Sequence, residues 1–73
     1  SGARFDPRPR PRGHAEVIVK ACRETPRTLD SVVLLTGLDL SEAALAMARL
    51  EHEGWLSESA GWFEVVDSWA DLA

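Results

Sequence analysis

Apolar residues early in the chain recur at the spacing of an amphipathic helix. Within residues 14–24 they fall three or four positions apart, and such positions share one helix face. The pair Thr25 and Pro26 ends this stretch, because proline disfavours helical backbone in the residue before it. We predict a first helix over residues 14–24. Its buried stripe is expected to contain Val17, Ile18, Ala21 and Cys22.

A second, shorter helix is predicted over residues 30–36, an apolar run followed by Gly37. Thr28 or Asp30 is expected to cap its start, since either side chain can accept a hydrogen bond from a free N–H group. Gly37 stands where helices commonly end in a left-handed residue. The residues just before this helix, 27–29, are predicted to form a very short strand.

The rest of the chain is organised around residues 41–56. Ser41 is expected to cap a third helix, Leu40 and Leu45 to form a hydrophobic staple at its start, and Gly54 to follow its end. The core face is expected to contain Ala43, Ala46, Met47 and Leu50. The opposite face is expected to present Leu45, Ala48, Arg49 and His52.

Two strands are predicted after the third helix. Residues 55–58 form the first, residues 59–61 the turn, and residues 62–66 an aromatic and β-branched return strand. The tail, residues 67–73, is expected to be one helical turn or frayed, with Trp69 and Leu72 able to dock back.

This order of elements is that of a winged helix-turn-helix. The predicted fold class is mainly α with a small β-wing, made of three helices and a two- or three-stranded antiparallel sheet. We divide the chain into a Pro/Arg-rich linker (1–13), a winged-helix domain (14–66) and a C-terminal tail (67–73). In the linker, prolines alternate with arginines, which predicts a semi-rigid polyproline-like spacer attached to something upstream. It is either a solvated tether or a set of arginines that contact phosphates or an acidic surface.

Composition narrows the function classes. A chain of 73 residues with 45% hydrophobic residues forms one small domain with a thin core. We expect no enzyme, since no catalytic constellation has a plausible spacing. One cysteine and two histidines do not predict a metal site, and no cofactor or small-molecule ligand is expected. No apolar run approaches the ~20 residues that span a bilayer, and no signal peptide is visible, so we expect a cytoplasmic protein.

The net charge of −4 hides a division along the chain. Residues 1–27 hold seven of the eight basic residues and three of the twelve acidic ones, for a net +4; residues 28–73 hold one base and nine acids, for a net −8. Such an asymmetry bears on binding partners more than on fold. The possible nucleic-acid contacts are Arg8, Arg10, Arg12, Lys20, Arg23, Arg27 and Arg49.

Residues 28–56 resemble the C-terminal winged-helix domain of the DNA-processing protein A (DprA) family, and the likeness extends over residues 14–66. It rests on a Thr-Leu-Asp entry at 28–30, a Thr-Gly-Leu turn at 36–38, the Ala/Leu-rich third helix and a Leu-Glu-x-x-Gly exit at 50–54. The wing departs from the family's Gly-Gly-Arg-Tyr-like ending with Ala-Gly-Trp-Phe at 60–63, and the acidic tail is an addition.

The resemblance implies a parent protein that binds incoming single-stranded DNA and helps to load recombinase during natural transformation. That activity belongs to a nucleotide-fold core with no matching positions here, so none of its functional residues is carried over. The winged-helix part is an accessory domain in that family.

Two functions remain open. The favoured one is an acidic protein-interaction module, which binds a protein or the upstream domain of its own chain and has at most weak DNA contacts through its basic N-terminal segment. The partner surface is expected to include Leu45, Arg49, His52, Trp62 and Trp69. The alternative is a transcription regulator that places the third helix and the wing on duplex DNA. The many carboxylates of that helix argue against it.

Overall fold

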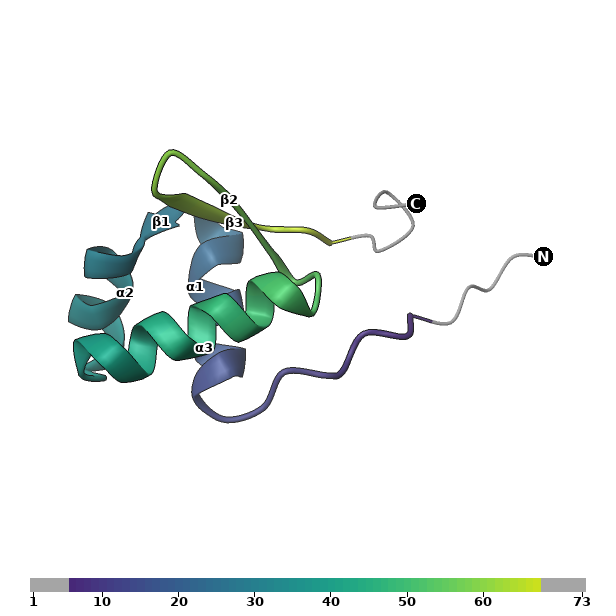
Figure 1. Cartoon of the computed structure of the whole chain (residues 1–73), viewed down its shortest axis with the longest axis horizontal. Helices are drawn as coiled ribbons and strands as arrows, with labels where there is room; N and C mark the ends of the chain where they lie inside the picture. The colour runs from purple at the N-terminus through teal and green to yellow at the C-terminus, as the bar shows by residue number, and fades with distance from the viewer. Residues whose placement is uncertain (1–5, 68–73) are drawn as a thin grey trace.

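The computed structural model describes residues 6–67 and confirms the predicted fold class. Its elements follow the winged-helix order (Figure 1). They are α1 (His14–Glu24), β1 (Arg27–Thr28), α2 (Leu29–Thr36), α3 (Leu40–His52), β2 (Leu56–Ser59) and β3 (Trp62–Val65). The predicted docking of Trp69 and Leu72 lies outside the described residues.

The three strands form one antiparallel sheet in the order β1-β3-β2. β2 and β3 make the wing, with Leu56 opposite Val65 and Ser59 opposite Trp62. The two residues between them, Ala60 and Gly61, both have positive φ, 52° and 85°. Two positive φ angles in a two-residue loop suit the right-handed twist of a hairpin. β1 adds two residues to the other edge of β3, so the predicted short strand is present.

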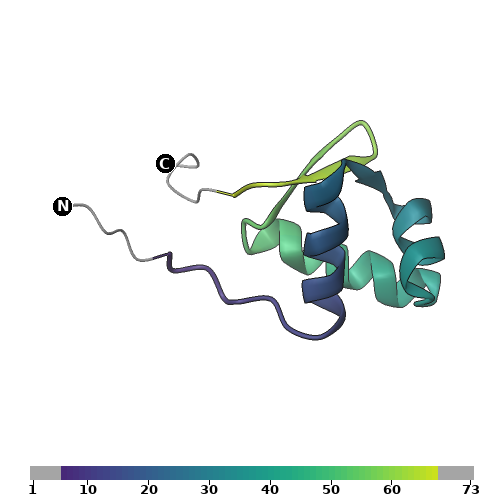
Figure 2. The ribbon, with the colours of Figure 1, turned by 180° about the vertical axis from the view of Figure 1, so that it is seen from behind.

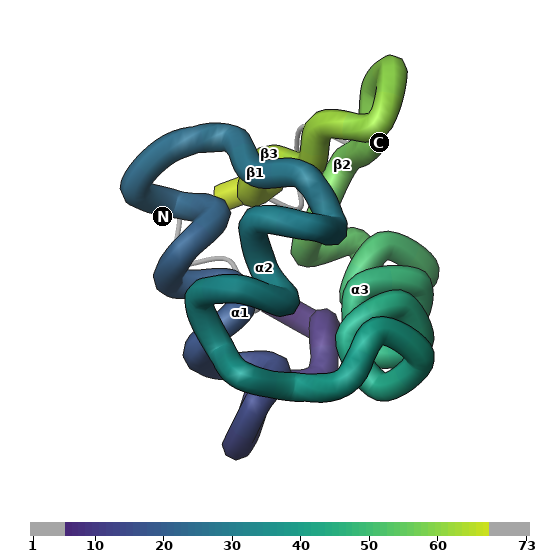
Figure 3. The backbone as a smooth tube through the Cα atoms, turned by 90° about the vertical axis from the view of Figure 1, so that its left-hand side faces the viewer, coloured from purple at the N-terminus to yellow at the C-terminus, as the bar shows by residue number. Residues whose placement is uncertain are grey.

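The core lies where the three helices meet beneath the sheet (Figure 3). Three of the four predicted core residues of α3 are fully buried, and Ala46 packs partly buried against them. The buried cluster contains Ile18, Val19, Cys22, Val32, Ala43, Met47, Leu50 and Leu56.

The predicted stripe of α1 was wrong in one position. Val19 is buried, whereas Val17 is 49% exposed. Three consecutive apolar residues on a helix span about 200° and cannot all face one core. Ile18 and Val19 face the core, so the buried face of α1 is rotated from Val17 toward Val19.

The predicted start of α3 was also wrong. Asp39, not Ser41, is the N-cap: its Oδ1 accepts a hydrogen bond from the Glu42 N–H at 2.9 Å. Ser41 instead donates its hydroxyl to the same carboxylate. These bonds lower the pKa of Asp39, chiefly the one from the Glu42 backbone.

The earlier start of α3 removes the expected staple, because Leu40 and Leu45 are both exposed. Leu38 now precedes the cap and packs against the core, on which Ala43 also lies. This pair occupies the positions that a hydrophobic staple requires. For α2, the cap is Thr28, whose side chain accepts from the Ser31 N–H, and Gly37 closes the helix at φ 75° as predicted.

Among the described residues, no single helix has the length and hydropathy to cross a membrane. α2 and α3 meet that test only when taken together, and they are bent by 117° at the turn between them.

Candidate interaction surfaces

The first candidate surface is the outer side of α2 and α3, which we call the helix-turn-helix face. It presents large apolar side chains to solvent: Leu34 is 86% exposed and Leu45 68%, and Leu35 and Leu40 are exposed as well. Arg49 and His52 follow Leu45 at helical spacing and are also exposed. Leu34 and Leu35 come from α2 and Leu40 and Leu45 from α3, and exposed apolar side chains that gather in one patch mark interaction sites.

The charge on this face is negative. α3 carries Glu42 and Glu51 against Arg49, a net charge of −1. The wing adds Glu58 and Glu64 and contains no base. The Glu58 carboxylate accepts a hydrogen bond from the Gly61 N–H at 2.7 Å, which ties it to the wing turn. The third helix and wing thus present carboxylates where a duplex-binding protein needs cations.

Trp62 lies apart from the leucines, on β3, and is 53% exposed. It borders a shallow hollow with Thr25, Pro26, Ser59 and Glu64. Of the predicted partner residues, Leu45, Arg49 and His52 share α3, Trp62 belongs to the wing, and Trp69 lies outside the described residues.

Sequence reasoning missed Leu34, Leu35 and Leu40 as surface residues. The signal was present in Val32-Val33-Leu34-Leu35: a two-turn helix cannot bury four consecutive apolar residues. Only Val32 becomes fully buried. Leu40 was not predicted to be exposed, because the predicted start of the third helix was two residues too late. That start assigned Leu40 to the hydrophobic staple.

The second candidate surface is built on Arg8, whose side chain is only 5% exposed. Its guanidinium carbon lies 3.7 Å from the centroid of the Trp55 ring, a close cation–π contact. The indole N–H of Trp55 in turn donates to the Pro9 carbonyl at 2.7 Å. We call Asp6, Arg8, Pro9 and Trp55 the Arg8 latch.

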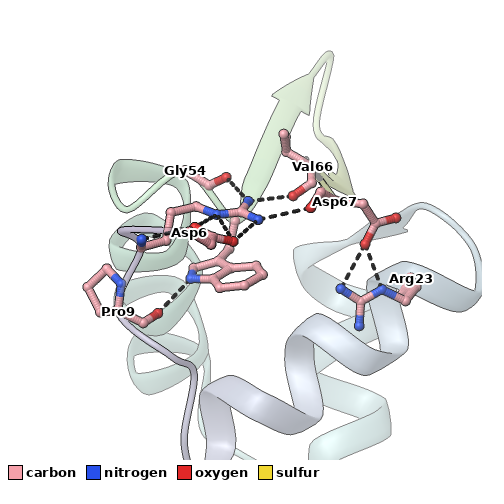
Figure 4. A network of polar contacts seen from close by, with 8 residues as sticks. Asp6, Pro9, Arg23, Gly54, Val66 and Asp67 are labelled. Carbon is pink, nitrogen blue, oxygen red and sulfur yellow. Dashed lines mark hydrogen bonds and ion pairs between the residues drawn. The ribbon is translucent and has the colours of Figure 1, made fainter. Parts of the chain in front are cut away.

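All five N–H donors of Arg8 have acceptors (Figure 4). One terminal nitrogen donates to the carbonyls of Gly54 and Val66. The other donates to the Asp67 carbonyl and the Asp6 carboxylate, which Nε also contacts. Arg8 therefore joins the N-terminal segment to the end of α3 and the end of β3.

The latch corrects the prediction of a solvated tether for residues 6–9. It also leaves Arg8 without a free donor for a phosphate. The hydrogen bond from Arg8 lowers the pKa of Asp6, which keeps that carboxylate ionised beside the guanidinium. Backbone carbonyls 46 to 59 residues away accept from Arg8, and such acceptors leave no mark in a sequence.

A groove of about 430 Å³ runs between the latched segment and α1. Figure 2 shows α1 on the near side and the N-terminal segment leaving its base. We call this the basic groove, because its walls hold four basic and two acidic side chains, a net charge of +2 on a chain whose net charge is −4. It is lined by Asp6, Arg8, Arg10, Pro11, Glu16, Val19, Lys20, Arg23 and Trp55.

The basic side chains of the groove differ in whether they already form ion pairs. Arg10 and Lys20 are exposed and make no ion pair within residues 6–67. Arg23 pairs with Asp67 at 2.8 Å, but both side chains are about half exposed or more, and such a pair is weak. The structure thus gathers four of the seven predicted nucleic-acid residues, three of them with accessible charge.

The other three predicted cations lie elsewhere. Arg12 is exposed but does not line the groove. Arg27 donates to the Ala21 carbonyl and contacts Glu24 at 3.3 Å, which holds it at the end of α1. Arg49 stands on α3 among carboxylates.

Cys22 is buried, and desolvation raises the pKa of its thiol. A raised pKa disfavours the reactive thiolate. Within residues 6–67, no group of three His, Cys, Asp or Glu side chains is placed to hold a metal ion. Comparison of the chain with models of protein families, with curated proteins and with solved structures gave no match.

Proposed function

We propose that this chain is an accessory winged-helix domain that acts as a protein-interaction module through its helix-turn-helix face. The observation that carries the proposal is the exposure of Leu34 and Leu45 on α2 and α3, with Leu35 and Leu40 beside them. Apolar side chains on a polar surface typically mark a site that a partner covers. The partner is another protein or a further domain of the same polypeptide.

The charge of the face supports the same proposal. Its carboxylates repel phosphates but complement a partner with a basic rim, and such complementarity favours the correct partner and speeds association. Arg49 and His52 are the only basic or titratable cationic side chains that α3 offers. α3 occupies the place of a recognition helix in the fold. Its exposed leucines and carboxylates suit a protein surface better than a DNA groove.

We further propose, from the resemblance to the DprA family, that the parent protein takes part in DNA processing during natural transformation in the cytoplasm. The element order and the capped α2 ending in Gly37 agree with that likeness. The test is deletion of the segment that encodes this domain. Deletion is expected to lower the frequency of transformation by added DNA, and an unchanged frequency contradicts this part of the proposal.

The interaction role is tested by affinity capture on the immobilised chain, using an extract of the cells that produce it. A doubly substituted chain, L34S/L45S, is expected to lose its captured partner. V17S is the control, since Val17 is also an exposed apolar residue but lies on α1. Equal capture by both variants contradicts the assignment of the face.

The alternative function, duplex binding through α3 and the wing, is tested by titrating the isotopically labelled chain with duplex DNA. We expect no chemical-shift changes along α3 at moderate salt. Shifts at Leu45, Arg49 and His52 that persist as salt is raised would overturn the interaction role and establish the alternative.

A further inference from the structure

We propose that the basic groove binds the phosphate backbone of single-stranded nucleic acid, through Arg10, Lys20 and Arg23. This site goes beyond the proposed protein interaction, since it lies on α1 and the N-terminal segment and shares no residue with the helix-turn-helix face. It stands on the charge and shape of the groove alone.

The cations of the basic groove are available to a ligand. Arg10 and Lys20 are solvent-exposed from opposite walls of the groove, and the described residues offer neither of them an ion pair. Arg23 is held only by an exposed pair with Asp67, which a phosphate can displace at little cost. A guanidinium also matches two phosphate oxygens at once.

The basic groove is already assembled in the free chain. Its outer wall is an extended segment that includes three prolines, at positions 7, 9 and 11. Without contacts to the domain, such a segment would sample many orientations in solution, and ordering it would cost conformational entropy. The Arg8 latch fixes it against Trp55 and the ends of α3 and β3. A preformed wall lowers the cost of binding.

The shape of the basic groove favours a single strand over a duplex. A duplex is read by a protruding helix or ribbon that enters its groove, and in this chain α3 and the wing carry net negative charge. A concave basic groove instead follows the backbone of a single strand. Four basic side chains of this chain, Arg8, Arg10, Lys20 and Arg23, line such a concavity.

The lining of the basic groove favours nucleic acid over an acidic peptide. Peptide recognition relies on pockets for anchoring side chains or on a free strand edge. Here one contact surface of the Trp55 ring is covered by Arg8, and its N–H is taken by Pro9. Besides Trp55, the apolar residues of the wall are Pro11 and Val19, and neither forms a pocket for an anchoring side chain. Phosphate neutralisation needs no such pocket.

The same observations predict the character of the binding. Because Arg8 occupies one face of Trp55 and Pro9 accepts from its N–H, stacking of bases is restricted, so sequence preference is expected to be small. Three phosphate contacts give a plot of log affinity against log salt with a slope of about −2. The dissociation constant at physiological salt is expected to be about 10⁻⁴ to 10⁻⁶ M, the usual order for non-specific sites, and to be lower at low salt.

The test is fluorescence anisotropy of a labelled oligothymidylate of about 12 nucleotides, with the 73-residue chain at several salt concentrations. We expect K20A and R10A each to weaken binding about fivefold and to reduce the salt slope by about 0.7. R49A is the matched control, because it also removes one exposed cation from a helix. It is expected to change affinity less than twofold.

Three outcomes overturn the proposal. One is no binding by the unsubstituted chain at low salt; another is an R49A effect as large as that of K20A. The third is an oligoglutamate of equal charge that displaces the oligonucleotide as well as unlabelled oligothymidylate does. All the substituted side chains are exposed, and circular dichroism verifies that each variant is folded. Partner capture by the helix-turn-helix face is a separate measurement, so either site can fail alone.

Discussion

The helix-turn-helix face and the basic groove divide the chemistry of this domain between them. The face is apolar and acidic, with Leu34 and Leu45 in solvent and Glu42 exposed on the same helix as Leu45. The groove is basic, with Arg10 on the latched N-terminal segment and Lys20 on α1. In a duplex-binding winged helix the cations would belong on the third helix. Here they lie on α1 and the segment before it.

The difference shows that architecture and chemistry are separable in a fold this small. α3 is held in the position of a recognition helix by its inner side, where Met47 and Leu50 are buried. Its outer side is free to vary because it takes no part in the core. The groove, by contrast, depends on residues outside the three helices, and the contacts of Arg8 and Trp55 hold these residues against the ends of α3 and β3.

The largest expected effect separates the two sides of α3. Met47→Ala removes a side chain that is 1% exposed, and is expected to cost about 2–5 kcal/mol of the free energy of unfolding. Leu45→Ala removes one in solvent and is expected to change that free energy by less than about 0.5 kcal/mol.

Chemical denaturation followed by circular dichroism measures both variants. Met47→Leu is the control, since a swap of similar volume costs less than about 1.5 kcal/mol. A loss for Leu45→Ala as large as that for Met47→Ala would mean that the outer side of α3 is part of the core, and the comparison between face and groove would break.

The next effect concerns the latch. Arg8→Ala removes a buried guanidinium, its carbonyl hydrogen bonds and its contact with Trp55. We expect it to cost about 1–3 kcal/mol, because several charge-assisted bonds are lost while the N-terminal segment regains entropy on release. The indole N–H resonance of Trp55 is expected to lose its protection from hydrogen exchange.

A second variant, Arg8→Lys, separates the charge of the side chain from its hydrogen-bonding geometry. Lysine keeps the charge but lacks the planar fork of five donors. It is therefore expected to fall closer to Arg8→Ala than to the unsubstituted chain in the stability of residues 6–9. Full protection of the Trp55 N–H in Arg8→Lys would show that charge alone, without the fork, holds the segment.

The face and the groove also differ in how far sequence predicted them. The helices and the wing follow from apolar spacing, Gly37 and the Thr25–Pro26 pair, all of which are local signals. The start of α3 was misplaced because Asp39 and Ser41 are both good caps, and only the burial of Leu38 decides between them. The groove was missed as a site, although its cations were named. Its wall depends on carbonyls 46 to 59 residues from Arg8, and every residue has a carbonyl.

A third prediction concerns the pH dependence of the Asp39 cap at the start of α3. The pKa of Asp39 is lowered in the folded chain by its cap bonds, so folding favours the ionised form. Its contribution is fully present above the ordinary aspartate pKa of about 4 and is lost as pH falls through the lower folded value. Asp39→Ala is expected to reduce the unfolding temperature at pH 7 by about 4–8 °C.

Asp39→Asn keeps an acceptor at every pH and is expected to retain most of the cap. Thermal melts from pH 7 to pH 3 compare the three chains. The Asp39→Asn variant should lose less stability on acidification than the unsubstituted chain. Asp6, whose pKa is also lowered, contributes to the remaining acid dependence through the latch. Identical pH profiles for the unsubstituted chain and the Asp39→Asn variant would contradict the cap assignment.

The smallest effect compares two glutamates that occupy the same place on different helices. Glu16 and Glu42 each stand third in their helix, α1 and α3, so substitution by Gln costs both helices a similar interaction with the dipole. Glu16 lines the basic groove and Glu42 does not. Glu16→Gln is therefore expected to tighten oligothymidylate binding about twofold, by removing one repulsive charge beside Lys20.

Glu42→Gln is expected to leave that affinity unchanged at moderate salt, because interactions between exposed charges are screened beyond about 10 Å. Anisotropy titrations at one salt concentration measure both variants, and their similar helix content serves as the internal control. Equal tightening by the two variants would mean that net charge, and not the groove, governs binding. A gain confined to Glu16→Gln would locate the nucleic acid beside α1, since the two substitutions differ only in which surface they neutralise.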